Sequence, residues 1–185
     1  SGTLTITGGV LDLTGYGPTK GTTTFSGGLV TGGTLNSTAT YAATSGTVAT
    51  PLAGSVGLTM SGTGLFALSG VNTYSGVTTV SSGILAVSST DSLPVYSLTH
   101  TDYVCLSWVE KLFGFSNTDA GTAISTGTFA GGSSIGFDTS GGDRNYGTVI
   151  PNAGSNARGL VKLGAGTLIL SASNTFTGQT VMGTY

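Results

Sequence analysis

One segment of this chain occurs twice. Residues 57–80 and 159–182 share ten identical residues at the same spacing. The matched positions are Gly57, Leu58, Gly62, Gly64, Leu68, Ser69, Asn72, Thr73, Gly76 and Thr78, which return as Gly159, Leu160, Gly164, Gly166, Leu170, Ser171, Asn174, Thr175, Gly178 and Thr180. A repeat of this size is typical of solenoids, in which one unit cannot close a core and must stack on its neighbours.

Within the repeat, short apolar pieces alternate with Thr or Ser and are interrupted by Gly. Leu58 and Met60, then Phe66 and Leu68, fall on alternate positions, which indicates strands rather than helices. The pattern predicts one coil of a β-helix, with short strands that pair in parallel from coil to coil. We expect structural corners at Gly62, Gly64, Asn72 and Gly76, and at Gly164, Gly166, Asn174 and Gly178.

The motif that runs from Gly62 to Val80 is Gly-Thr-Gly-x-x-x-Leu-Ser-Gly-x-Asn-Thr-Tyr-Ser-Gly-x-Thr-Thr-Val. It resembles the passenger-associated strand repeat of bacterial autotransporters, and the copy from Gly164 resembles it as well. The resemblance implies an all-β, right-handed parallel β-helix that is exported to the cell surface. It also implies a structural or adhesive role without a shared active site.

Composition supports an ordered solenoid with few charged residues. Charged residues make up 6% of the chain, against about a quarter in ordinary domains, while 38% of residues are hydrophobic. The five basic residues are scattered, so nucleic-acid binding is not expected. We expect one β-solenoid domain over residues 1–185 that is a segment or repeating unit of a longer fibre, with repeats at 57–87 and 159–185.

Residues 94–118 depart from this pattern and predict an insertion. Val104, Trp108 and Leu112 share one helical stripe that ends before Gly114, which favours a short helix over 103–113. The aromatic residues in and around it form a candidate interaction patch: Tyr96, Tyr103, Trp108 and Phe115. A lid packed on its own solenoid is the favoured interpretation, and a docking site for a partner is the alternative.

No catalytic role is expected for this chain. His100, Asp102 and Ser107 are the residue types of a hydrolytic triad, but nothing like a nucleophile elbow surrounds Ser107. A carbohydrate-cleaving β-helix is the more serious enzyme alternative, because that architecture places acidic side chains on one face. Its candidate residues are Asp138, Asp143, Arg144 and Glu110, and they need to converge on one groove.

Neither a cofactor nor a metal ion is expected. The segment from Asp138 to Asp143 lacks the acidic density of a calcium loop. Cys105 has no partner for an intrachain disulfide, and a buried small side chain is its expected state. Threonine is abundant, but no regular Thr spacing of the kind that a binding ladder needs is evident along the sequence.

The two ends of the chain resemble neighbouring parts of one repeat. The second copy ends near Tyr185 without a match for Ile84–Val87, whereas Ser1-Gly-Thr-Leu-Thr-Ile6 resembles that strand. This predicts self-association end to end, as a homopolymer or a tandem array, because uncapped strand edges recruit other strands. A surface glycan or a neighbouring cell is the alternative partner, and no segment is apolar enough to span a membrane.

Overall fold

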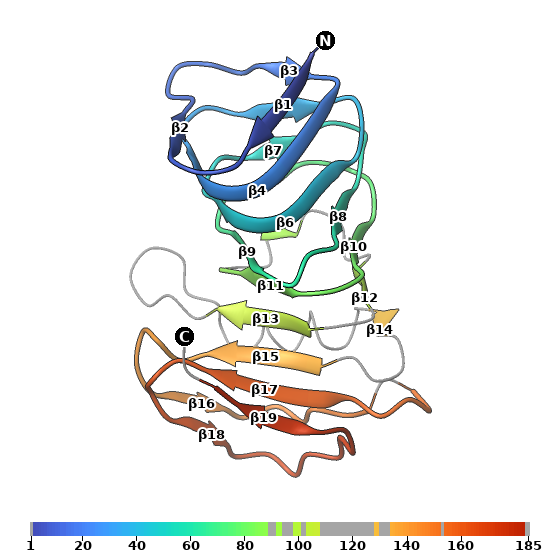
Figure 1. Ribbon diagram of the computed structural model, residues 1–185. Coiled ribbons are helices and arrows are strands. Elements are labelled where there is room, and N and C mark those ends of the chain that lie inside the picture. Colours follow the sequence, from blue (N-terminus) through green and yellow to red (C-terminus); the bar gives the residue numbers. More distant parts are fainter. Residues whose placement is uncertain are drawn as a thin grey trace.

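The chain folds into a stack of parallel β-strands. The computed structural model describes residues 2–88, 92–93, 98–100, 103–107, 128–129, 134–152 and 154–183. All elements in this part of the chain are β-strands, and it contains no α-helix and hence no helix that could cross a membrane. Figure 1 shows the strands stacked in successive layers from the blue N-terminal coil to the red C-terminal coil. The predicted all-β parallel solenoid is confirmed.

The strands lie on three faces, which we number in the order in which the chain first visits them. The first face consists of the following strands and half-strands: β1 (Thr3–Ile6), the first halves of β4 (Thr22–Thr31) and β6 (Tyr41–Val48), β8 (Leu58–Met60), β10 (Thr78–Val80), β12 (Leu98–His100) and β14 (Thr128–Phe129). Every neighbouring pair is parallel, so each coil repeats the path of the one before it.

The second face follows the first along the chain. It consists of β2 (Val10–Asp12), the second halves of β4 and β6, β9 (Leu65–Leu68), β11 (Ile84–Val87), β13 (Tyr103–Ser107), β15 (Ser134–Asp138), β17 (Gly159–Leu163) and β19 (Thr180–Met182). Strands β4 and β6 bend from one face to the next, and the register between them shifts at Ser26. Gly27 and Gly28 have φ of 154° and 74° at this bend.

The third face is the shortest and is interrupted. Its early part is β3 (Thr19–Lys20), β5 (Leu35–Ser37) and β7 (Leu52–Ala53), and its late part is β16 (Arg144–Tyr146) and β18 (Leu168–Leu170). Between these parts, the corner around Asn72 and Tyr74 lies on top of β7, because the amides of Thr73 and Tyr74 both donate to the Leu52 carbonyl. Irregular backbone can therefore replace a strand without breaking the stack.

The inward side chains of all three faces form one continuous core. Fully buried residues include Tyr41, Leu58, Met60, Phe66 and Leu68. Rings stack along the axis, and the centroids of Phe25 and Phe66 lie 5.2 Å apart. Burial of this apolar column is the main favourable term for folding.

One prediction about the insertion is wrong. The helix expected over 103–113 is absent in its first half, because Tyr103–Ser107 forms strand β13 between β11 and β15. Val104 pairs with Leu85 and Leu106 with Val87, both of which are buried inward residues. The two-residue period of Val104 and Leu106 therefore outweighs the helical stripe. Residues 108–113 lie outside the described part of the chain.

The two copies of the repeat begin on different faces. In the first copy, β8 lies on the first face and β9 on the second, whereas their counterparts β17 and β18 lie on the second and third faces. Within each copy the pairing is the same, since β10 pairs with β8 and β19 pairs with β17 at equivalent residues. The repeat therefore specifies a corner pattern and not a particular face of the solenoid.

Candidate functional site at the end of the last coil

The corner asparagine of the first copy connects three coils. Its side-chain oxygen accepts a hydrogen bond from the Leu52 amide at 2.7 Å, and its nitrogen donates to the Ser92 carbonyl at 2.7 Å. Asn72 is 3% exposed, so both backbone groups are satisfied inside the stack. Asn72 therefore links the coil below to the coil above.

The equivalent Asn174 makes only half of this link in the described part of the chain. Its oxygen accepts from the Ile150 amide at 2.8 Å, as Asn72 does from Leu52. Its nitrogen instead donates to the Ala172 carbonyl at 2.9 Å, within its own coil. The contact with the preceding coil is thus the same in both copies. The contact with the following coil is replaced in the second copy by a bond within the same coil.

The predicted corner glycines lie where the backbones of successive coils approach closely. A Cβ added to Gly76 would lie 2.4 Å from the Gly57 nitrogen, and one added to Gly178 would lie 2.5 Å from the Arg158 carbonyl. Both distances are too short for any side chain. The other predicted corners precede β9 and β18 and have similarly close backbone neighbours: Gly62 and Gly64 in the first copy, Gly164 and Gly166 in the second.

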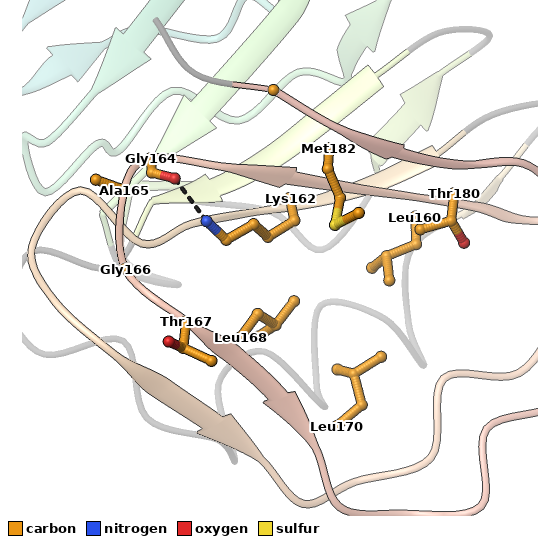
Figure 2. A pocket seen from close by; sticks show the side chains of 11 residues that line it. Leu160, Lys162, Gly164, Ala165, Gly166, Thr167, Leu168, Leu170, Thr180 and Met182 are labelled. Carbon is orange, nitrogen blue, oxygen red and sulfur yellow. Dashed lines mark hydrogen bonds between the residues drawn. The ribbon is translucent and has the colours of Figure 1, made fainter.

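A groove opens at the C-terminal end of the stack. It has a volume of about 590 Å³. Its lining is Leu160, Lys162, Gly164, Ala165, Gly166, Thr167, Leu168, Leu170, Thr180, Met182 and Gly183. Figure 2 shows Leu160 and Met182 facing Leu168 and Leu170 across this space. The groove is the interior of the last coil, and nothing in the described part of the chain covers it.

The first copy shows the same positions under a cover. Leu58, Leu68 and Val80 are at most 1% exposed, because β10, β11 and β12 respectively follow their strands. Their counterparts Leu160, Leu170 and Met182 line the groove, and Met182 is 80% exposed. The positions that pack against the next coil in the first copy therefore line an open groove in the second copy.

One charged side chain lies inside this groove. Lys162 occupies the position that Met60 has in the first copy, and it lies between Phe137 and Met182 in the strand register. Its ammonium donates a 2.5 Å hydrogen bond to the Gly164 carbonyl, which Figure 2 shows as a dashed line. An inward-pointing charge is one of the devices that limit indiscriminate pairing at sheet ends.

The described acidic candidates for carbohydrate cleavage accept hydrogen bonds from the backbone. Asp138 accepts from the Ser140 amide, and Asp143 accepts from the Thr167 amide at 2.7 Å. Hydrogen bonding with Thr167 holds the pKa of Asp143 below its usual value. A general acid needs a raised pKa instead. Arg144 donates to the Asp143 carbonyl, and Glu110 lies outside the described residues. No group of three metal-ligating side chains occurs among the described residues.

Little of the predicted interaction patch can be placed. Tyr103 begins β13 on the second face, between Ile84 and Ser134 in the register, and Tyr96, Trp108 and Phe115 lie outside the described residues. Of the triad residue types, His100 ends β12 and Ser107 ends β13, while Asp102 is not described. Cys105 is the middle residue of β13. The predicted lid stays a prediction.

The sequence analysis missed a regular column of threonines. On the first face, the register places Thr5, Thr24, Ala42, Thr59, Thr79, Thr99 and Thr128 side by side in successive coils. Coil lengths vary, so the column is not periodic along the sequence. The signal that could have found it is the repeated Thr-x-Thr or Thr-x-Ser pattern with an apolar central residue, as in Thr59-Met60-Ser61 and Thr79-Val80-Ser81.

Comparison with known families agrees with this geometry. The model of the passenger-associated-transport-repeat matches residues 58–87 and 160–181, which are the two copies described above. Two segments of the chain therefore match this repeat. The predicted resemblance to autotransporter passenger repeats is therefore confirmed, and the paired corner contacts of Asn72 and Asn174 are features of these repeats in this chain.

Proteins with similar sequences include a much longer one. The chain is 39% identical over 123 residues to the adhesin BmaC autotransporter of Brucella suis biovar 1 (strain 1330), an alignment that covers 62% of this chain and 3% of that protein. No solved structure matched the chain. The repeats, this relative and the solenoid fold support a surface-exposed passenger segment.

Proposed function

We propose that this segment is a structural, non-catalytic part of an exported surface protein and that it forms or extends a filament or stalk by stacking of coils. The observation that carries the proposal is the pair of repeats. The same positions line a closed core in the first copy and an open groove in the second. A stalk of this kind lengthens by adding coils and needs no active site.

Covalently joined copies test this function. Chains that contain one, two or three copies of residues 1–185 in tandem are compared by electron microscopy. A stalk predicts one rigid rod whose length increases by a constant increment per copy, since parallel strands are spaced about 4.8 Å apart. Beads joined at variable angles, or a length that does not increase regularly, would contradict the proposal. Circular dichroism of each chain confirms that the β-structure is retained.

The second candidate is an adhesive surface that binds a neutral glycan or a neighbouring cell. It is favoured by the uncharged column of Thr5, Thr24, Thr59 and Thr79 on the outside of the first face. A relative whose name contains the word adhesin agrees with it. Binding of the chain to neutral polysaccharides is measured with and without T59E and T79E. Equal binding by the parent and the double variant, or no binding by either, would exclude this surface.

A further inference from the structure

The outer surface of the second face carries a cluster of apolar side chains in its middle and late coils. The members of this outer cluster alternate with inward residues along β9, β11, β17 and β19, and they form a group separate from the core. They are Leu65, Ala67, Ile84, Ala86, Val161, Leu163 and Val181. On the first face, the matching outward column is mostly threonine. Strands that are apolar on both sides are typical of sheets that are covered on both sides.

The middle of the outer cluster is shielded from solvent. Ala86 and Val161 are both 5% exposed. Val161 lies beside Gly136 in the register, and a glycine has no side chain that could shield its neighbour. Ala67 and Val181, at the two ends of the cluster, are only half-buried. A cover therefore lies over the outer surface between β11 and β17.

None of the described strands supplies this cover. In the described part of the chain, the strands in extensive contact with β11, β15 and β17 are their neighbours in the same sheet. Ala86 and Val161 are buried within the single chain, so the cover is part of the chain itself. The longest segment outside the described ranges is 108–127.

This segment is long enough and starts in the right place. Residues 108–127 connect β13 to β14, whereas residues 69–77 and 88–97 make the same connection between faces in the two preceding coils. The segment begins directly after β13, which lies between β11 and β15. An extended stretch of ten residues reaches about 33 Å, and the three strand spacings from Ala86 to Val161 amount to about 14 Å. The extra length therefore suffices to cross the outer cluster.

The composition of the segment matches an apolar surface. Its first half contains Trp108, Val109, Leu112, Phe113 and Phe115. We propose that residues 108–117, the covering segment, bind the outer cluster and lie over Ala86 and Val161. Exposed apolar patches promote association between molecules, so the covering segment keeps neighbouring solenoids from associating side by side. This property goes beyond the proposed stalk function and does not depend on it.

Fluorescence of Trp108 tests the proposal in the 185-residue chain. Trp108 is the only tryptophan in the sequence, so its emission reports on the covering segment alone. We expect emission at short wavelength and slow quenching by iodide, because the ring packs against apolar side chains. A86K and V161K each place a charge under the covering segment, and both should shift the emission to longer wavelength and accelerate quenching. Emission typical of a solvent-exposed indole in the parent chain would overturn the proposal, and so would an unchanged spectrum in both variants.

T79K is the matched control, because Thr79 is an outward residue of the same coil as Ala86 but lies on the first face. It should leave the emission and the quenching of Trp108 unchanged, and a shift as large as that of A86K would contradict the proposed location. Circular dichroism of each variant separates loss of the cover from loss of the fold. The measurement on the parent chain does not depend on any variant.

A second copy of the chain is the alternative occupant of this surface. Sedimentation and the quenching of Trp108 are therefore measured over the same range of protein concentrations. Slow quenching in a monomer, unchanged on dilution, is the expected result. Quenching that accelerates as a complex dissociates would assign the cover to the second copy and overturn the proposal.

Discussion

The two repeats share ten of 24 residues and the corner contact with the coil below, but they differ in what lies above them. Leu68 in the middle of the stack is 1% exposed, and Leu170 at the end of the stack is half-buried. Asn72 bonds to the coils on both sides, whereas Asn174 bonds to the coil below and to its own coil. The difference teaches that the sequence of a repeat specifies its own path, while its neighbours supply its stability.

The largest expected effect on stability concerns the inward position that is Met60 in the first copy and Lys162 in the second. M60K places an ammonium in a fully buried site, which we expect to cost about 3–5 kcal/mol in the free energy of unfolding. K162M removes a half-buried charge at the open end and should change stability by less than about 1 kcal/mol. Denaturant unfolding of both variants is the measurement. Equal effects would show that the end of the stack is as closed as its middle.

A second comparison uses the same substitution in both copies. L68A creates a cavity among buried side chains and should cost about 2–5 kcal/mol, whereas L170A, in the open groove, should cost about 1 kcal/mol. Urea unfolding followed by circular dichroism compares the two midpoints. If L170A is as damaging as L68A, then a cover already protects the groove in solution.

The third comparison concerns the corner asparagines. N72A leaves the Leu52 amide and the Ser92 carbonyl without partners and should cost about 1–3 kcal/mol, with a smaller loss for N174A. N72D retains the acceptor for Leu52 and removes the donor to Ser92, but it also buries a carboxylate, so its cost includes a desolvation penalty besides the lost upward contact. Hydrogen exchange of the Leu52 amide should accelerate in N72A and stay slow in N72D. Rapid exchange in the parent chain would argue against the link.

The smallest expected effect concerns Tyr74, whose counterpart is Phe176. Burial raises the pKa of Tyr74 to about 12, above the ordinary value of 10.0. The unfolded chain therefore loses this proton first, and the stabilising contribution is full below pH 10 and is lost as pH rises toward about 12. Y74F removes the 2.6 Å hydrogen bond to Thr78 and should cost about 1 kcal/mol at neutral pH.

The same variant should reduce the alkaline loss of stability without abolishing it. Tyr41 is also buried with a raised pKa of about 12 and contributes a similar dependence. Unfolding midpoints between pH 8 and about pH 11 compare Y74F with the parent chain. An identical pH dependence in the two proteins would show that Tyr74 does not titrate differently in the folded and unfolded states.

Much of the fold could be predicted because the repeat marks its own corners. Gly76 and Gly178 are required where two backbones nearly touch, and the alternation of Leu58 with Met60 defines the inward side of a strand. The helix over 103–113 was wrong in its first half because Val104 belongs both to the helical stripe and to a strand alternation with Leu106. Stacking on Leu85 and Val87 decides between the two patterns, and it is a contact between coils.

The end groove and the threonine column could not be predicted in the same way. Leu170 has the same sequence surroundings as Leu68, so only the absence of a covering coil among the described residues distinguishes them. Thr59 and Thr79 are neighbours although they are 20 residues apart, whereas Thr5 and Thr24 are neighbours at a separation of 19 residues. Which residues lie side by side depends on the sum of all loop lengths between them.

The change of face between the two repeats has a consequence for how such proteins vary. Thr79 and its counterpart Val181 are both outward residues, yet they point away from different sides of the solenoid. Duplicating a repeat therefore does not simply copy a surface, because the number of residues inserted before it decides the direction in which its side chains point. Lengthening a solenoid by duplication therefore redistributes its exposed side chains around the axis.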